Sequence, residues 1–191
     1  MTGDSNKQKG FSIVELLITG FVFSIIFGVA TSTFVNAVRV QKYNMAHQHL
    51  LDQAGYAMEY MSRSLRMAKV DDGSCGVGNN VNYKIIGGGK GIVFKNYNDE
   101  CVQLFWNDTT KKLIVYISSS PIGSGVRLNN VPLNSNNYPA TRVQFSIDGE
   151  GQSDNYQPRA TIFLEMEDVR LTRDNPRITI QTTVSQRNLD E

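Results

Sequence analysis

Glu15 is a carboxylate set against an apolar segment, five residues after Gly10. From Leu16 to Val38 the chain carries no charged side chain, and this run is longer than the ~20 apolar residues that cross a bilayer. A carboxylate beside such a run is costly unless it has a partner, so it indicates a function. Cleavage after Gly10 would create that partner. The new amine of Phe11 would lie one helical turn from Glu15, on the same subunit or on a neighbour.

The apolar run predicts a retained membrane span. A secretory signal has an apolar core of about 7–15 residues followed by small residues at a cleavage site, and this run is longer. Lys7 and Lys9 precede it and favour a cytoplasmic N-terminus. The chain from Arg39 onward is then expected outside the cytoplasm.

Cys75 and Cys101 are the only cysteines. Outside the cytoplasm a pair of this kind is expected to form a disulfide. Closing a loop of ~26 residues would stabilise a small domain by about 3 kcal/mol. The alternative is two buried or free thiols, and a metal site is disfavoured because so few ligands are present.

One acidic segment resembles a calcium loop in its spacing. Asp148, Glu150 and Asp154 place oxygen ligands at alternate positions, but Arg159 stands where an EF-hand needs its twelfth-position acid. A solvated turn is the preferred interpretation, and no cofactor is predicted. A weak calcium site of another arrangement stays open at these residues.

Other candidate motifs fail on their spacing. The glycines before Lys90 lack the first Gly and the Ser or Thr of a phosphate-binding loop, so a hairpin turn is expected there. His47 and His49 lie on different faces of a helix and cannot easily share a metal. Glu165, Glu167 and Asp168 have no nucleophile or base near them in the sequence, which favours an acidic strand face. No catalytic constellation is present, and the prediction is that the chain is not an enzyme.

The element pattern predicts an α+β protein in four segments. Residues 1–10 are a polar leader, 11–38 the transmembrane half of a long helix and 39–70 its amphipathic half. In the amphipathic half apolar side chains recur every three or four positions. Residues 71–191 form a β-rich head, in which 91–97, 101–106 and 112–118 predict an antiparallel meander. Residues 142–147, 159–169 and 176–184 supply further strands, and Ile178, Ile180 and Val184 alternate as a half-buried sheet requires.

The N-terminal motif resembles the processing site of type IV prepilins and pseudopilins. Its residues are Lys9-Gly10-Phe11-Ser12-Ile13-Val14-Glu15-Leu16-Leu17. The resemblance implies that a prepilin peptidase cleaves after Gly10 and methylates the new N-terminal Phe11. It further implies that Glu15 pairs with a neighbouring subunit's amine during assembly, and that the helix packs on an antiparallel sheet in a pilin-like head.

The whole chain is most similar to the larger minor pilins and the J-type minor pseudopilins of type II secretion. Residues 60–68, 141–145 and 176–188 carry this diffuse likeness. The implied partners are the prepilin peptidase, other pilins or pseudopilins, and the inner membrane before assembly. The implied location is the cytoplasmic membrane, then a periplasmic or cell-surface filament.

Two rival functions stay open. The first is an adhesin or DNA-uptake binding module presented at a filament tip, which shares the anchor and differs in what residues 71–191 touch. The second is a membrane-tethered enzyme, for which the sequence offers no converging polar groups. The net charge is +1, and no clustered basic surface of the kind that attracts nucleic acid is visible. Whether the filament is a pilus, a secretion pseudopilus or a DNA-uptake filament is not encoded in these patterns.

Overall fold

The computed structural model describes residues 10, 12–119, 129–149, 157–171 and 175–186. The chain divides into two compact units, Met1–Asn44 and Met45–Glu191. The first unit holds the N-terminal part of one long helix, α1 (Ile13–Arg66). The second holds the rest of that helix and every strand of the described chain. An α+β architecture with a long N-terminal helix, as predicted, is therefore present.

Helix α1 is 54 residues long and contains no proline. An interior without proline keeps the ladder of backbone hydrogen bonds intact. Gly20, Gly28 and Gly55 are its only glycines, so few positions weaken its helical propensity. The helix ends at Arg66, a few residues before the end expected from the periodicity.

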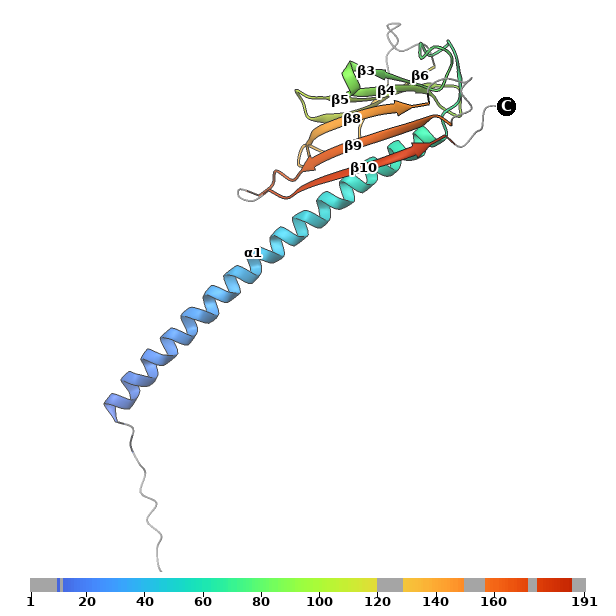
Figure 1. Ribbon diagram of the computed structural model, residues 1–191. Coiled ribbons are helices and arrows are strands. Elements are labelled where there is room, and N and C mark those ends of the chain that lie inside the picture. Colours follow the sequence, from blue (N-terminus) through green and yellow to red (C-terminus); the bar gives the residue numbers. More distant parts are fainter. Residues whose placement is uncertain (1–9, 11, 120–128, 150–156, 172–174, 187–191) are drawn as a thin grey trace, which may run out of the picture. The chain divides into compact units, whose positions relative to one another are not determined.

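In the second unit the apolar stripe of α1 is buried, as the periodicity predicts. Its buried residues are Ala46, Leu50, Ala54, Ala57, Met58, Met61 and Leu65. Spacings of three and four residues place them on one side of a helix. They form one core with residues from both larger sheets, and Figure 1 shows these turns of α1 running behind β9 and β10.

The strands of the head are short at first and longer toward the C-terminus. In chain order they are β1 (Asp71–Asp72), β2 (Asn79–Val81), β3 (Tyr83–Ile86), β4 (Gly91–Lys95), β5 (Cys101–Asn107), β6 (Lys112–Ser118), β7 (Asn129–Pro132), β8 (Ala140–Asp148), β9 (Arg159–Glu167) and β10 (Arg177–Ser185). A 3-10 turn, η1 (Gly87–Gly89), joins β3 to β4.

All strand pairs are antiparallel, and they form separate sheets. One sheet has five strands in the order β3-β4-β5-β6-β7, a second has three in the order β10-β9-β8, and β1 pairs with β2 alone. The meander predicted from residues 91–118 is confirmed as β4, β5 and β6. The expectation of a single sheet in the head was wrong, because β8, β9 and β10 pair only with one another and form a sheet of their own.

Two local expectations need correction. The segment 71–82 is rich in Gly, Asn and Asp, which predicts a loop, but it contains the paired strands β1 and β2. Strand β7 was not predicted, because Asn129, Asn130 and Pro132 have low strand propensity. Pairing with β6 nevertheless holds it in the sheet.

The glycine-rich turn is a hairpin connection, as predicted. Gly87, Gly88 and Gly89 all have positive φ, between 60° and 94°, a region that side chains with a Cβ rarely adopt. The turn reverses the chain between β3 and β4, which pair from Ile86 and Gly91 onward. Its glycines therefore serve the backbone of the turn.

Polar side chains fasten the helix end to the strands around the core. The Tyr83 hydroxyl donates to the Leu65 carbonyl at 2.7 Å, and the Gln186 amide donates to the Ala68 carbonyl at 2.8 Å. The Trp106 indole donates to the Ala140 carbonyl at 2.9 Å, linking β5 to β8. These bonds fix the end of α1, both sheets and the segment after β10 within one packed unit.

Candidate functional site

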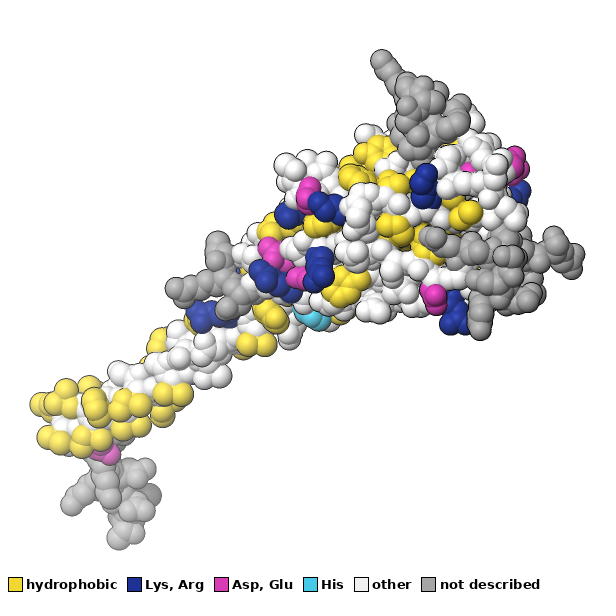
Figure 2. Space-filling model, turned by 45° about the horizontal axis from the view of Figure 1, so that its top comes forward, with side chains coloured by type: hydrophobic (Ala, Val, Ile, Leu, Met, Phe, Trp, Pro, Cys, Tyr) yellow, Lys and Arg dark blue, Asp and Glu magenta, His cyan; other side chains and the backbone are white. Residues whose placement is uncertain are grey.

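The N-terminal unit is a helix whose apolar side chains face outward. From Ile13 to Phe34 its large hydrophobic residues are between 47% and 80% exposed, and Figure 2 shows hydrophobic side chains covering this part of the helix. By length and composition, α1 can cross a membrane. An exposed apolar surface of this extent marks a membrane or protein contact.

Hydroxyl groups within this unit are satisfied by the helix itself. Thr19, Ser24, Thr31 and Thr33 donate to carbonyls four residues earlier, at 2.8–2.9 Å. A polar group in hydrocarbon is tolerated when it is bonded internally. These four hydroxyl groups are therefore compatible with lipid surroundings.

Glu15 lies in the first turn of α1, and its side chain is exposed. No ion pair or side-chain hydrogen bond joins its carboxylate to another of the described residues. A negative charge is favourable at the N-terminal end of a helix dipole, but the cost of placing it near lipid stays. Gly10 is exposed, and Phe11 lies outside the described residues, so the predicted pairing of its amine with Glu15 stays a prediction.

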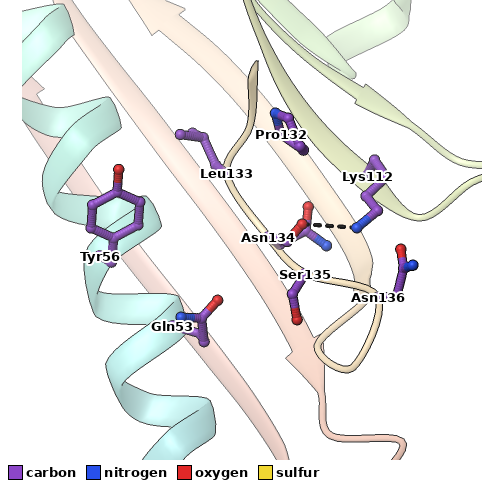
Figure 3. Close-up of a pocket in the computed structure, with 8 residues that line it drawn as sticks. All are labelled: Gln53, Tyr56, Lys112, Pro132, Leu133, Asn134, Ser135 and Asn136. Atoms are coloured by element: carbon purple, nitrogen blue, oxygen red, sulfur yellow. Dashed lines mark hydrogen bonds between the residues drawn. The ribbon is translucent and has the colours of Figure 1, made fainter. Parts of the chain in front are cut away.

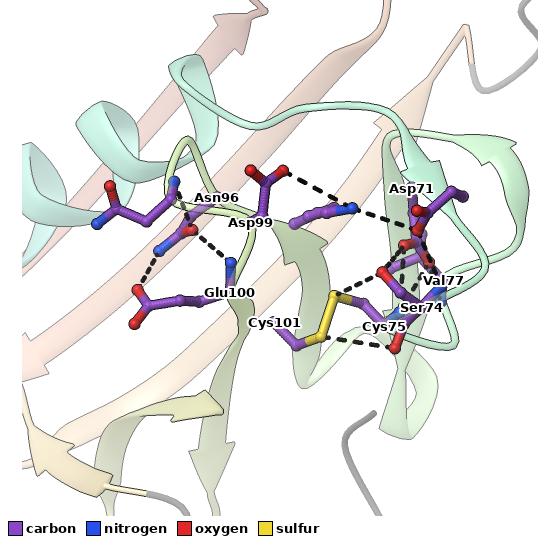
Figure 4. The surroundings of a disulfide bond; sticks show 11 residues. Asp71, Ser74, Cys75, Val77, Asn96, Asp99, Glu100 and Cys101 are labelled. Carbon is purple, nitrogen blue, oxygen red and sulfur yellow. Dashed lines mark hydrogen bonds and ion pairs between the residues drawn. A yellow bond between two sulfur atoms is a disulfide. The ribbon is translucent and has the colours of Figure 1, made fainter. Parts of the chain in front are cut away.

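Cys75 and Cys101 are joined by a disulfide with Cα atoms 5.2 Å apart. Both are 2% exposed and pack with Val77 and Val93 in a small second cluster. The bond ties the segment after β1 to the first residue of β5. Figure 4 shows this region with its polar neighbours.

Asp71 holds the same segment by a second means. Its buried carboxylate accepts hydrogen bonds from the backbone N–H groups of Cys75 and Val77, each at 3.1 Å, and from the Ser74 hydroxyl at 3.2 Å. Three donors on one carboxylate satisfy its burial. The role of Asp71 was not predicted, although an Asp before a Gly-rich segment is a recognisable signal for a side-chain-bonded turn.

A set of charges at the surface lies beside this turn, with Asp72 and Asp99 exposed and the Lys95 side chain 11% exposed. The Lys95 ammonium is 3.2 Å from the Asp72 carboxylate and 3.7 Å from that of Asp99. Hydrogen bonds from Ser74 and then from Lys95 hold the pKa of Asp72 well below its usual value. Such surface pairs contribute little to stability, so we assign this set a local ordering role.

Asp168 departs from the acidic strand face predicted for it. Glu165 and Glu167 are half-buried on β9, whereas Asp168 follows the strand and is fully buried. Its carboxylate accepts from the Arg170 guanidinium at 2.6 Å and from the Arg170 backbone N–H at 2.9 Å. Burial raises the pKa of Asp168, but the Arg170 hydrogen bonds outweigh it and keep that pKa below its ordinary value.

The Arg170 guanidinium continues this cluster onto an aromatic ring. It lies 4.8 Å from the centre of the Tyr138 ring, within the range of a cation–π contact. The Asp168 carboxylate and the Arg170 guanidinium are therefore paired with each other, and this pair ties the end of β9 to the Tyr138 ring.

An open trough lies where α1 approaches the segment after β7. One hollow, of about 490 Å³, is lined by Gln53 and Tyr56 of α1, Lys112 of β6, and the segment 132–136. In Figure 3, Gln53 and Tyr56 stand on one side of this hollow and Lys112 and Asn136 on the other. This site could not be predicted from the sequence, because its residues come from three distant segments and match no motif.

Only one residue of the acidic segment at 148–154 is described among those for which a weak calcium site was left open. Asp148 ends β8 and is exposed, while Glu150 and Asp154 lie outside the described residues. Within residues 10, 12–119, 129–149, 157–171 and 175–186, no group of three or more His, Cys, Asp or Glu side chains could hold a metal ion. The described part of the chain supplies no further argument for a calcium site.

The chain matches no protein-family model, no curated protein and no solved structure.

Proposed function

We propose that this chain is a minor pilin or minor pseudopilin, a structural subunit of a type IV pilus or a type II secretion pseudopilus. Prepilin peptidase cleaves it after Gly10 and methylates Phe11, and the mature chain assembles through its N-terminal helix. Before assembly that helix anchors the subunit in the inner membrane, with the head outside the cytoplasm. In this function the chain is the substrate of an enzyme and has no catalytic role.

The observation that carries the proposal is the division of α1 into an exposed apolar part and a buried amphipathic part. Phe21, Phe23, Phe27 and Phe34 are 64–69% exposed, whereas the stripe from Ala46 to Leu65 is buried in the head. Burial of apolar area yields about 25 cal/mol per Å². The exposed part therefore has a strong tendency to enter lipid or to pack against the same part of neighbouring subunits.

Glu15 supports an assembly role over simple anchoring. An anchor needs no charge next to its apolar run, and a carboxylate near lipid weakens insertion. In a filament the carboxylate would pair with the Phe11 amine of a neighbour, and only a correctly placed neighbour would supply that amine. Because an unpaired buried charge is strongly destabilising, the pair would select one register among the possible helix packings.

The head supports the same proposal by its architecture. The buried part of α1 packs on antiparallel strands, which is the arrangement that the resemblance to pilins implies. A disulfide at Cys75 and Cys101 fits a head that folds outside the cytoplasm. Both features are common to other extracellular domains, so the exposed apolar helix with Glu15 is the stronger argument.

The proposal is tested by comparing Glu15→Ala with Glu59→Ala in cells that assemble the filament. Glu59 is on the same helix and is 69% exposed, in an ion pair with Arg63. This pair is expected to contribute little, so Glu59→Ala is a matched control for the loss of one glutamate. The measurement is the share of the protein that is recovered with sheared or pelleted filaments, relative to the membrane fraction.

We expect Glu15→Ala to be cleaved, but its filament fraction should be at least about tenfold smaller than that of the unmodified chain. A tenfold change corresponds to the loss of about 1.4 kcal/mol of assembly free energy from the Glu15 charge pair. Glu59→Ala is expected to assemble like the unmodified chain. Equal assembly of the two variants would remove the role given to Glu15. An unmodified chain that never leaves the membrane fraction, although the peptidase is present, would overturn the filament proposal as a whole.

A further inference from the structure

The trough beside α1 continues past the hollow shown in Figure 3. A second hollow of about 500 Å³ adjoins it, and the two share Lys112, Pro132 and Asn136. Both hollows are wide open to solvent, so a ligand would lie along them and would not be enclosed. The shared residues make one extended trough, which suits an elongated ligand better than a compact one.

We call these two hollows together the amide trough: most of its exposed lining is apolar, and carboxamides are the commonest polar groups in it. Gln53 and Asn136 contribute to the first hollow, and Asn107, Asn130 and Asn136 to the second. Each carboxamide offers two N–H donors and a carbonyl acceptor. This combination matches hydroxyl groups, which donate and accept at once. Ser135 and Thr110 add hydroxyls of their own.

The charge of the amide trough is low. No described carboxylate lines either hollow, and Lys112 is the one cationic side chain among the lining residues. Its ammonium donates to the Asn134 carbonyl at 2.9 Å, so part of its hydrogen-bonding capacity is already used. A nucleic acid needs several cations for its phosphates, and the trough does not supply them. The matching ligand is neutral and polar.

Tyr56 supplies an apolar surface at one side of the trough. Tyr56 is 59% exposed, more than Met45 and Leu51, the other exposed large hydrophobic residues in the part of α1 that belongs to the head. An aromatic ring can pack against the C–H face of a pyranose while amides bond its hydroxyls. A neutral oligosaccharide combines the two surfaces that the trough presents.

The edge strand argues against an extended peptide as the ligand. Strand β7 has only four residues, Asn129–Pro132, and Pro132 has no backbone N–H to donate. A peptide that adds to a sheet edge depends on main-chain hydrogen bonds, and proline at an edge prevents such pairing. Recognition at this edge must therefore come from side chains.

The floor of the trough is held rigidly. Asn134 is 4% exposed. Its amide oxygen accepts from the Leu113 backbone N–H at 2.8 Å, and its amide nitrogen donates to the carbonyls of Lys111 and Tyr138 at 3.0 and 2.9 Å. These bonds fix the segment 132–136 before any ligand arrives. A fixed site loses less entropy on binding than a mobile one.

We propose that the amide trough is a binding site for a neutral oligosaccharide, with Tyr56 stacking on one ring and Asn136 and Gln53 bonding ring hydroxyls. This inference stands on the head alone and does not depend on filament assembly. Failure of either proposal leaves the other untouched, because the tests use different residues and different measurements.

The test is saturation-transfer NMR on the full chain, purified in a zwitterionic detergent without a sugar headgroup. The probes are neutral oligosaccharides built from glucose, galactose, mannose and N-acetylglucosamine. The variants are Tyr56→Ala and Asn136→Ala. Matched controls lie away from the trough: Tyr97→Ala, whose side chain is 58% exposed, and the exposed Asn98→Ala.

At least one probe is expected to give a saturable signal on the unmodified chain and on both controls. Tyr56→Ala and Asn136→Ala are each expected to raise its Kd about fivefold or more, the usual effect of losing one good contact. The proposal is overturned if none of the probes binds, or if the trough variants and the controls bind alike. Binding of extended peptides at the trough, with no response to oligosaccharides, would also overturn it.

Discussion

Removal of the disulfide is expected to destabilise the head by an amount set by its loop length. The bond joins Cys75 and Cys101, which are 26 residues apart. Cross-linking a loop of this size removes about 12 cal/mol/K of entropy from the unfolded chain, which is about 3.5 kcal/mol at 25 °C. A domain of this size loses roughly 2–4 °C of Tm per kcal/mol, so the expected fall is roughly 10 °C.

Alanine is the suitable replacement at both positions. Cys75 and Cys101 are buried with Val77 and Val93, and a serine would place a hydroxyl in that apolar cluster. The double variant Cys75→Ala/Cys101→Ala still keeps the hydrogen bonds of the Asp71 carboxylate. Loss of the covalent link is therefore separated from loss of the polar turn.

The assay is urea unfolding of the full chain in detergent, followed by Trp106 fluorescence. Trp106 is the only tryptophan and is 8% exposed in the core, so its emission reports unfolding of the head. The double variant and the reduced unmodified chain are expected to unfold at a similarly lowered urea midpoint. A reductant is expected to have no effect on the double variant.

The reasoning would be refuted if the reduced chain, with two titratable thiols, unfolded at the same urea midpoint as the oxidised chain. That result would mean that the segment 71–77 is held by the Asp71 hydrogen bonds alone. A fall much larger than about 3.5 kcal/mol would also contradict the account, because it would require the disulfide to hold the packed core itself.

Two further variants test the polar contacts of the head. Asp168→Asn is expected to cost about 1–3 kcal/mol at pH 7, because Arg170 loses its charged partner. Since the pKa of Asp168 is lowered in the folded state, the stabilisation by its carboxylate is present above the unfolded pKa of about 3.9 and is lost as the pH falls below that value. In urea titrations, the difference in unfolding free energy between the unmodified chain and Asp168→Asn should therefore be smaller at pH 3 than at pH 7. An equal difference at both pH values would contradict this. Gln186→Ala is expected to lower the free energy of unfolding by about 1–3 kcal/mol, because it leaves the Ala68 carbonyl without its donor. The control Gln181→Ala, at an exposed position, should change it by no more than about 0.5 kcal/mol. Equal effects of the two variants would show that the Gln186 hydrogen bond does not hold the helix end to the head.

The helix and the longer strands could be predicted because their signals are local. An uninterrupted 3.6-residue period identified the buried stripe from Leu50 to Leu65, and alternation identified β10. These patterns depend on which face of an element is buried, and each element carries its own pattern. The helix end and the meander β4-β5-β6 followed from the same reasoning with small shifts in their bounds.

The parts that escaped prediction depend on contacts between distant segments. The separation of the strands into two larger sheets follows from pairing partners, which no single strand specifies. Burial of Asp168 depends on the ring of Tyr138, which comes from a distant segment and lies against Arg170, two residues after Asp168. The amide trough combines residues 53, 112 and 136 for the same reason, and the strand β7 exists only because β6 offers it a partner.

The N-terminus of the mature protein, measured by mass spectrometry with and without a prepilin peptidase in the cell, is the most direct test of the central claim. We expect a chain that begins at methylated Phe11 when the peptidase is present, and an uncleaved chain with its first ten residues when it is absent. A chain that begins at Met1 in both cells would contradict the account. It would leave a membrane-anchored head whose N-terminal Gly10–Phe11 bond and Glu15 have no part in filament assembly.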